Sequence, residues 1–242
     1  MGEAVQKSES QILETVSKQK GCKMAQILSE LFLFWESLTA EQQRLVEDVK
    51  MVESYKKGET IHRTDNSCKG LVAVKKGQLR TYILSEEGRE ITLFRVADGE
   101  VCVLSASCLL EAITFDVLME AMEDTEIVVI PAMVLKRIME VNPAVELYLY
   151  KTATEKFSDV MWTMQQILFL KIDQRVAQFL WDESVKQGVQ TLHLTHDEIA
   201  KYIGSAREVV SKVLKYLESE QAVATGRGTV TIVNKEKLRN LL

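Results

Sequence analysis

The order of hydrophobic and polar residues divides the chain into parts with strand periodicity and parts with helical periodicity. From Tyr55 to about Ile130, short runs rich in β-branched and aromatic residues alternate with turns such as KKG, SEEG and ADGE. The predicted strands are TIH, GLVAV, GQLRTYIL, REITLFRV and EIVVI. Several short strands at this spacing predict a small antiparallel barrel or sandwich. Residues 24–53 have the periodicity of amphipathic helices, with a break from Ser37 to Thr39, and the polar residues 1–23 predict a disordered tail.

A stripe of hydrophobic residues with the spacing of a coiled-coil seam follows the predicted barrel. Its members are Tyr150, Ala153, Phe157, Val160, Met164 and Ile167. They lie on a helix that we expect to begin near Pro143. The stripe predicts pairing with a second copy of the chain, and the alternative is that it packs against its own domain. Residues 171–188 predict a further amphipathic helix that ends at Gly188, with Val176, Phe179 and Leu180 facing inward.

The segment LTHDEIAKYIGSAREVVSKVLKYL predicts two short helices separated by one glycine. Thr195 with Glu198, and Ser205 with Glu208, both have the [ST]-x-x-E spacing of a capping box. In a capping box the hydroxyl and the carboxylate bind free backbone N–H groups at a helix start, so we expect each pair to begin a helix. Gly204 permits a tight turn between them. The expected local structure is a helix-turn-helix.

The second helix of this pair, about residues 205–218, has an apolar side and a polar side. The apolar residues are Val209, Val210, Val213, Leu214 and Leu217, and they can pack onto Ile199, Ala200 and Ile203. The polar side contains Arg207, Glu208, Ser211, Lys212 and Lys215. Such side chains read base edges in a major groove, although an ordinary helical hairpin also exposes charges. The following AVATGRGTVTIVN predicts a β-hairpin with Arg227 at its tip, which resembles the wing of a winged helix and favours DNA binding.

Composition and charge fit a two-domain protein whose C-terminal part binds DNA. The 242 residues, 46% of them hydrophobic, are enough for two cores. No apolar run is long enough to span a membrane, and the N-terminus lacks the order of a secretory signal, so we expect a soluble cytoplasmic protein. The net charge is −5, but residues 171–242 carry +2 and the rest −7. This small positive charge favours a dimer that contacts two half-sites.

Taken together, these segments resemble the CRP/FNR family of bacterial transcription regulators. The resemblance covers nearly the whole chain from about Leu31, and GSAREVVSKVL is similar to the family's recognition-helix motif without a gap. It implies an α+β fold with an N-terminal cyclic-nucleotide-binding-like β-barrel (a double-stranded β-helix, or jelly roll), a long central dimerisation helix and a C-terminal winged helix-turn-helix. The predicted domains are the tail 1–23, a helical lead and sensor barrel 24–133, helices 134–170, and a DNA-binding domain 171–242.

The resemblance also implies roles for individual residues. The predicted DNA contacts are Thr195, Ser205, Arg207, Glu208, Ser211, Lys212 and Arg227. Arg207 and Glu208 would read bases, and Thr195 would contact phosphate. The family often has Ser at the position of Ala206 and Arg at the position of Lys212. Because Lys cannot form the bidentate fork of Arg, the half-site preference at that position does not carry over.

The barrel lacks the residues that a cyclic nucleotide needs. In members that bind cyclic AMP, a Gly-Glu pair binds the ribose and an Arg about ten residues later neutralises the phosphate. Gly99 and Glu100 match the pair, but no Lys, Arg or His occurs from Val96 to Leu135, where eight residues are acidic. An anion there would meet carboxylates without a paired cation. We therefore predict that cyclic AMP is not the signal and that Gly99-Glu100 is a barrel turn.

The four cysteines are candidate sensor residues. Cys102 and Cys108 lie in VCVLSASC, and Cys22 and Cys68 lie before it. Thiolates could ligate an iron–sulfur cluster, as in oxygen-sensing FNR-type members, or form a redox disulfide. Those members place three ligands near the N-terminus, where this chain has only Cys22. The default alternative is that the thiols are inert and buried.

The functional prediction is a sequence-specific DNA-binding transcription regulator that acts as a homodimer. Its candidate partners are double-stranded DNA, a second copy of the chain and RNA polymerase. None of the motifs GxxxxGK[ST], GxSxG, HExxH or paired CxxC occurs, so no enzyme class is predicted. The alternative is a small-ligand, redox or iron–sulfur sensor that acts through protein contacts, with a helix-turn-helix that is only structural.

Overall fold

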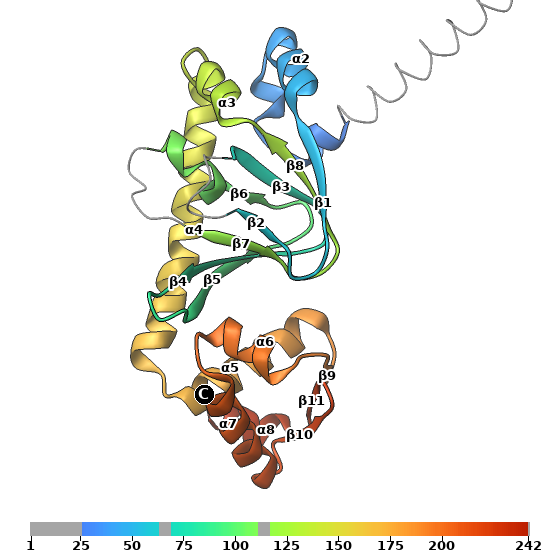
Figure 1. Ribbon diagram of the computed structural model, residues 1–242, viewed down its shortest axis with the longest axis vertical. Coiled ribbons are helices and arrows are strands. Elements are labelled where there is room, and N and C mark those ends of the chain that lie inside the picture. The colour runs from blue at the N-terminus through green and yellow to red at the C-terminus, as the bar shows by residue number, and fades with distance from the viewer. Residues whose placement is uncertain (1–25, 63–68, 111–116, 242) are drawn as a thin grey trace, which may run out of the picture. The chain divides into compact units, whose positions relative to one another are not determined.

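The computed structural model describes residues 26–62, 69–110 and 117–241, and Figure 1 shows their helices and strands. The chain forms two compact units, which are described separately below. Residues 1–79 and 96–154 belong to the first unit, and residues 80–95 and 155–242 belong to the second. The predicted N-terminal tail, Cys22 and Cys68 lie outside the described residues.

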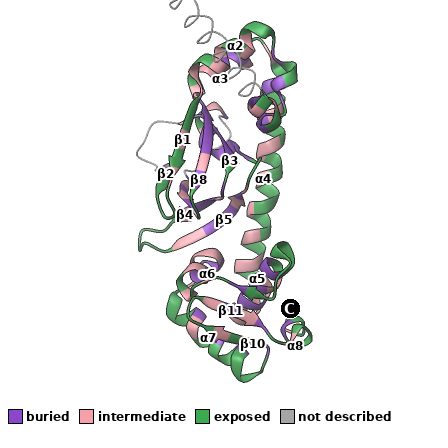
Figure 2. Cartoon of the chain, turned by 90° about the vertical axis from the view of Figure 1, so that its right-hand side faces the viewer, coloured by how far each residue is buried: buried purple, intermediate pink, exposed green. Residues whose placement is uncertain are grey.

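The predicted antiparallel β-fold is confirmed as two four-stranded sheets (Figure 1). The first sheet has the order β1-β8-β3-β6, formed by β1 (Met51–Tyr55), β8 (Thr125–Ile130), β3 (Leu71–Lys76) and β6 (Val101–Cys102). The second has the order β2-β7-β4-β5, formed by β2 (Thr60–His62), β7 (Leu118–Ala121), β4 (Leu79–Leu84) and β5 (Glu90–Val96). Residues 71–74 and 127–130 are fully buried, so β3 and β8 form the centre of this core (Figure 2).

The helical lead is shorter than predicted. Residues 26–31 are helical, and they precede the 3₁₀ helix η1 (Trp35–Ser37) and the helix α2 (Ala40–Val49). The predicted break before α2 is confirmed, because Thr39 caps that helix in a capping box with Gln42. The prediction that residues 51–53 are helical is wrong. They form β1, since pairing with β8 satisfies their backbone groups and outweighs the helical periodicity.

The Gly99-Glu100 pair forms a turn between strands, as predicted. Gly99 has a φ of +79°, a conformation that favours glycine. The backbone N–H of Glu100 donates to the carbonyl of Ala97 at 3.0 Å, and its carboxylate accepts from the N–H of Ala97 at 2.9 Å. Glu100 therefore closes the turn with its side chain. The chain continues through the 3₁₀ segment η2 (Val103–Leu109) and the helix α3 (Ala132–Met139).

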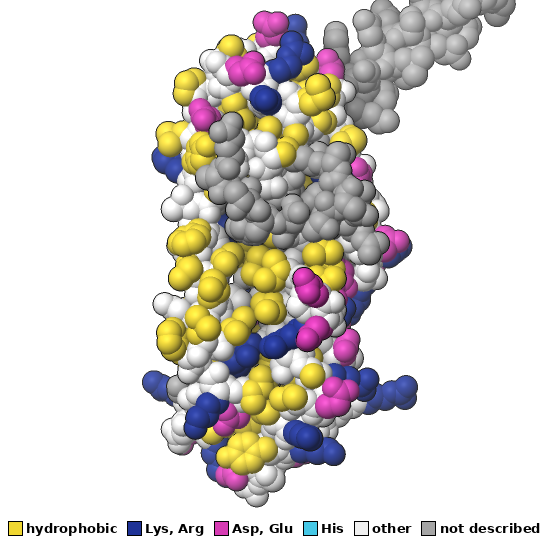
Figure 3. Space-filling view, turned by 60° about the vertical axis from the view of Figure 1, so that its left-hand side comes forward, with side chains coloured by type: hydrophobic (Ala, Val, Ile, Leu, Met, Phe, Trp, Pro, Cys, Tyr) yellow, Lys and Arg dark blue, Asp and Glu magenta, His cyan; other side chains and the backbone are white. Residues whose placement is uncertain are grey.

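The long helix α4 (Pro143–Phe169) begins at the predicted proline and has an exposed apolar surface. Only Val145 and Leu149 are fully buried on it. Its large exposed hydrophobic side chains are Leu147, Tyr150, Phe157, Met161, Trp162, Met164, Leu168 and Phe169. Figure 3 brings this side of the molecule forward and shows hydrophobic side chains gathered there. Within the described chain, α4 therefore leaves most of its apolar side chains in water.

The second unit contains the predicted winged helix-turn-helix. Its helices are α5 (Ile172–Gln187), α6 (His196–Ile203), α7 (Arg207–Ser219) and α8 (Lys235–Arg239). A three-stranded sheet of order β10-β11-β9 joins β10 (Val223–Gly226), β11 (Thr229–Ile232) and β9 (Thr191–Leu192). α5 ends at Gly188, as predicted, with a φ of +67°. Val176 and Leu180 are buried in the common core, whereas Phe179 is half-buried and packs against it.

Candidate nucleic-acid interface

The start of α6 is fixed by the predicted capping box. The backbone N–H of Glu198 donates to the hydroxyl of Thr195 at 3.2 Å, and the N–H of Thr195 donates to the carboxylate of Glu198 at 2.8 Å. The helix ends at Gly204, whose left-handed backbone (φ +63°, ψ +50°) turns the chain toward α7. Residues that are visible in the sequence therefore determine both ends of α6. Thr195 and Glu198 determine its start, and Gly204 determines its end.

The second predicted capping box is wrong. α7 begins at Arg207 with Ala206 as its N-cap residue, and no side chain caps it. Ser205 still belongs to the turn, since its backbone N–H donates to the carbonyl of Ala200 at 2.9 Å as the chain leaves α6. The turn after Gly204 contains one residue more than the capping-box spacing predicts. Ala206 is therefore the N-cap residue in place of Ser205, and the helix starts at Arg207. Ser205 is half-buried at this turn.

α7 has the predicted division into two sides, with one exception. Val210, Leu214 and Leu217 are fully buried against the core of the second unit. Val209 was predicted on the buried side but is 37% exposed, because it lies at the edge of the apolar stripe in the first turn. The exposed side chains of the outward surface are Arg207, Glu208, Lys212 and Lys215. The apolar contacts hold the helix from behind and leave this polar surface available.

Ser211 is less free than its position in the sequence suggests. Its hydroxyl donates to the carbonyl of Arg207 at 2.9 Å and lies 2.8 Å from Nδ1 of His196 at the start of α6. The remaining lone pair of the oxygen can still accept a hydrogen bond from a base amino group. The contact with His196 positions the start of α6 beside the outward surface of α7. Sequence reasoning missed this contact, because periodicity along one helix does not show which residue of another helix it meets.

The predicted wing is confirmed as the hairpin of β10 and β11. Gly226 pairs with Thr229, so Arg227 and Gly228 form the turn. Gly228 has a φ of +70°, which suits a two-residue hairpin turn. Arg227 is exposed at the tip, and the carboxylate of Glu218 on α7 accepts from the backbone N–H of Thr225 at 3.0 Å. The wing is thereby attached to α7.

The hairpin formed by residues 80–95 contacts the turn of the helix-turn-helix, which the sequence did not indicate. Nε of Arg89 donates to the carbonyl of Gly204 at 3.1 Å, and the hydroxyl of Thr92 donates to the carbonyl of Lys201 at 2.9 Å. A Cβ at position 204 would lie 3.1 Å from Cγ1 of Ile91. The glycine therefore serves both the turn of the chain and this close approach.

The cysteines that the structure describes are not bonded to each other. Cys102 forms no disulfide and is fully buried in the barrel core, whereas Cys108 is exposed and disulfide-bonded. Among the described residues, no group of three or more His, Cys, Asp and Glu side chains is placed to hold a metal ion. The sensor role of the four cysteines stays a prediction.

Comparisons with known proteins agree with this architecture. Residues 174–241 match the Crp-like helix-turn-helix domain, and residues 52–142 match the cyclic nucleotide-binding domain. A crystal structure of a putative transcriptional regulator of the Crp/Fnr family from Eubacterium rectale is 43% identical, with a TM-score of 0.82, over 87% of this chain and 98% of that one. The transcriptional activator protein Anr of Pseudomonas protegens is 28% identical over 90% of both chains. The cAMP-activated global transcriptional regulator CRP of Pasteurella multocida is 21% identical over 75% of this chain and 89% of its own.

A helix-turn-helix with a wing, following a cyclic-nucleotide-binding type of β-fold, defines a class of DNA-binding transcription regulators. The chain belongs to the Crp/Fnr family. Members of this family are transcription regulators and not enzymes. In the part of the chain that the structure describes, no helix has the length and apolar character to cross a membrane.

Proposed function

We propose that the chain acts as a homodimer that inserts its two α7 helices into successive major grooves of a near-palindromic DNA site. The observation that carries this proposal is the outward surface of α7. Arg207, Glu208 and Lys212 are exposed, and within the described residues their side chains form no hydrogen bond or ion pair. Arg binds O6 and N7 of guanine, a carboxylate accepts from N4 of cytosine, and Lys binds guanine or phosphate. The surface therefore has the donors and acceptors of a base reader.

Phosphate contacts complete the proposed interface. Arg227 at the exposed tip of the wing would bind the DNA backbone, and Thr195 and Ser205 would contact it beside the recognition helix. The hydroxyl of Thr195 accepts from the N–H of Glu198 and donates to the carboxylate of Glu198 at 2.8 Å, so it would keep its cap but turn its proton from that carboxylate to phosphate. These contacts fix the register on the duplex, whereas Arg207 and Glu208 select the sequence.

The apolar stripe on α4 supports the homodimer. Tyr150, Phe157 and Met164 from the predicted seam are exposed, while Ala153, Val160 and Ile167 are half-buried. The stripe alternates at three and four residues, so the same stripe of a second copy would fit it. A two-fold axis between paired helices would place two recognition helices against two half-sites of opposite orientation. We include RNA polymerase as a partner at such a site, and the cytoplasm as the place of action, because relatives of this kind activate transcription.

The signal that controls the dimer is, in this proposal, not cyclic AMP. From Val96 to Leu135 the chain has no Lys, Arg or His, so a phosphodiester in this part of the barrel would lack a paired cation. The side chain of Glu100, which would have to bind a ribose, closes its own turn instead. The relatives include both the activator Anr and the cAMP-activated CRP, so they do not identify the signal. This part of the proposal therefore rests on the residues of this chain.

The experiment is selection of binding sites from random duplexes by the full-length protein, followed by fluorescence anisotropy on the selected site and on a scrambled site. We expect an inverted repeat whose affinity exceeds that for scrambled DNA by at least about 10³-fold and falls steeply with salt. Added cyclic AMP should leave both affinities unchanged. Failure to enrich any sequence would contradict the proposal and favour a regulator that acts through protein contacts. A strong response to cyclic AMP would overturn only the part that concerns the signal.

A further inference from the structure

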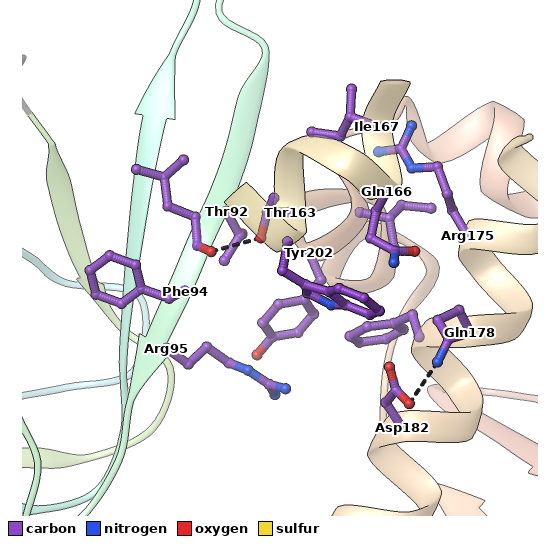
Figure 4. A pocket seen from close by; sticks show the side chains of 14 residues that line it. Thr92, Phe94, Arg95, Thr163, Gln166, Ile167, Arg175, Gln178, Asp182 and Tyr202 are labelled. Carbon is purple, nitrogen blue, oxygen red and sulfur yellow. Dashed lines mark hydrogen bonds between the residues drawn. The ribbon is translucent and has the colours of Figure 1, made fainter. Parts of the chain in front are cut away.

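A cavity of about 200 Å³ lies within the second unit, away from the outward surface of α7. Its walls come from β5, the C-terminal end of α4, α5 and α6 (Figure 4). Arg95 reaches in from β5 on one side, and Gln178 and Asp182 lie on α5 on the other side (Figure 4). Arg175 also lines the cavity from α5, with its guanidinium beside Ile167 (Figure 4). Neither the proposed DNA contacts nor the four cysteines belong to this cavity.

Aromatic rings form much of the cavity wall. The rings of Phe179 and Tyr202 are stacked, with centroids 5.1 Å apart and planes 25° apart. Trp162 also lines the cavity and is 56% exposed, which is a large open surface for an indole. Flat faces of this kind favour a flat apolar or aromatic group through offset stacking and burial of apolar surface. The cavity is small enough to limit such a group to about one or two rings.

The two arginines of the cavity differ in how their charges are compensated. Arg95 forms an ion pair with the buried carboxylate of Glu183 and lies over the ring of Tyr202. Burial raises the pKa of Glu183, but the hydrogen bond and charge of Arg95, together with the hydrogen bond from Gln187 and the charge of Lys186, outweigh this effect, so the pKa lies below its ordinary value. Glu183 therefore stays ionised and neutralises Arg95.

Arg175 has no such partner among the residues that the structure describes. It is half-buried, and no carboxylate of the described residues lies within ion-pair distance of its guanidinium. Burial lowers the pKa of Arg175, and the positive charge of Arg89 lowers it further, so its surroundings disfavour the charge. Gln166, which lies on the same side of the cavity as Arg175 (Figure 4), also has a side-chain amide without a hydrogen-bond partner among the described residues. A half-buried cation next to an unused amide donor is an incomplete site for an anion.

We propose that this cavity binds a small aromatic carboxylate, with the carboxylate on Arg175 and Gln166 and the ring against Trp162 and Phe179. A guanidinium matches a carboxylate with two parallel hydrogen bonds, and the amide N–H of Gln166 can add a third. A single negative charge fits better than the two of a phosphate monoester, because Asp182 also lines the cavity and Arg95 is already neutralised. The ligand would contact β5 and α6 together and would thereby stabilise the contact of the 80–95 hairpin with the helix-turn-helix.

The test is isothermal titration calorimetry of the full-length protein with 1-naphthoate and benzoate, without DNA. The matched neutral probe is 1-naphthamide, which keeps the ring and loses the charge. We expect binding of at least one of the two acids, and weaker binding of the amide by about tenfold or more, since charge-assisted hydrogen bonds carry the recognition. In the Arg175→Gln variant, the affinity for the acid should fall by about tenfold or more, whereas the affinity for the amide should stay within about twofold.

The control is Arg239→Gln, which removes an exposed arginine from α8 in the same unit, outside the cavity. It should leave the affinities for both probes unchanged. A circular-dichroism melting curve should show that both variants are folded. No binding of either acid to the natural protein would overturn the proposal, and so would equal binding of acid and amide, or an Arg175→Gln variant with unchanged affinity for the acid. Because DNA is absent from the titration, these outcomes do not depend on the proposed DNA-binding function.

Discussion

α7 and α4 are both amphipathic helices, but only α7 buries its apolar side within the described chain. Val210, Leu214 and Leu217 on α7 have no exposed surface. On α4, Phe157 is 61% exposed and Phe169 is 78% exposed, and only the first two turns are anchored in a core. One helix presents polar side chains to the solvent, and the other presents apolar ones.

This difference indicates what kind of partner each helix lacks. Exposed charged side chains are stable in water, so α7 is complete without DNA and can offer its polar groups to a polar partner. Burial of apolar surface contributes about 25 cal/mol of stabilisation for each Å², so α4 gains stability when another apolar surface covers its exposed side chains. The comparison predicts that changes on α4 affect assembly, whereas changes on α7 affect only what the assembly binds.

The largest effect is expected from Phe157→Glu on α4. In a homodimer this change places two carboxylates in an apolar interface, and unpaired buried charges cost several kcal/mol. We expect the dimer dissociation constant to rise by about two orders of magnitude, with a parallel loss of affinity for the palindromic site. Analytical ultracentrifugation measures the first effect and fluorescence anisotropy the second.

The control for this variant is Ser158→Glu, which introduces the same carboxylate at the next residue, exposed and outside the stripe. It should leave the dimer intact. A Phe157→Glu protein that still sediments as a dimer would show that α4 is not the interface. The exposed apolar side chains of α4 would then need another explanation.

A smaller effect is expected from Arg207→Ala on α7. Loss of a bidentate contact to guanine should weaken binding to the selected site by about 1–3 kcal/mol and relax the preference at one base pair. Dimerisation should not change, because the side chain of Arg207 forms no hydrogen bond or ion pair within the described chain. Anisotropy on the selected site and on single-base variants of it provides the measurement.

Arg227→Ala in the wing is the matched comparison for Arg207. A phosphate contact carries no sequence information, so this variant should weaken binding about equally on all sequences and reduce the salt slope by about one. If Arg207→Ala also weakened binding to specific and scrambled DNA equally, Arg207 would be a phosphate contact and the assignment of α7 as base reader would fail.

The smallest effects are expected at the two positions that both have a capping-box spacing in the sequence. Thr195→Ala removes the cap of α6 and should lower the free energy of unfolding by about 1 kcal/mol. Ser205→Ala removes no cap and should change it by less than about 0.5 kcal/mol. Denaturant unfolding monitored by circular dichroism compares the two. Equal losses would mean that Ser205 stabilises the start of α7 by a contact other than a cap.

Much of the DNA-binding module could be predicted from the sequence, because local rules determine it. The cap at Thr195, the turn at Gly204 and the wing turn at Arg227 each depend on residues within four positions of one another. The N-cap of α7 was misplaced by one residue for a related reason. The pattern at Ser205 has the spacing of a capping box. However, the backbone N–H of Ser205 donates to the carbonyl of Ala200 in the preceding turn, and Ala206 is the N-cap residue instead.

Non-local features could not be predicted in the same way. Residues 51–53 look helical, yet they form a strand because β8, more than seventy residues later, pairs with them. The contact of Ser211 with His196 and the approach of Ile91 to Gly204 join residues that no spacing rule connects. The uncompensated charge of Arg175 was equally hidden, since a lone arginine on an amphipathic helix ordinarily lies in water.

The sequence by itself determined the order of barrel, long helix and winged helix-turn-helix, and it led to the predicted DNA contacts, because periodicity, caps and turns are local properties of the chain. It also shows no Lys, Arg or His from Val96 to Leu135, where the resemblance places the cation that binds a cyclic nucleotide. Only the tertiary structure decided which side chains are already engaged and which are left over. Burial, ion pairing and hydrogen bonding depend on neighbours that are distant in the chain. Among the described residues, Arg95 is therefore neutralised while Arg175 forms no ion pair, and the hydroxyl of Ser211 is hydrogen-bonded while the side chain of Arg207 is not.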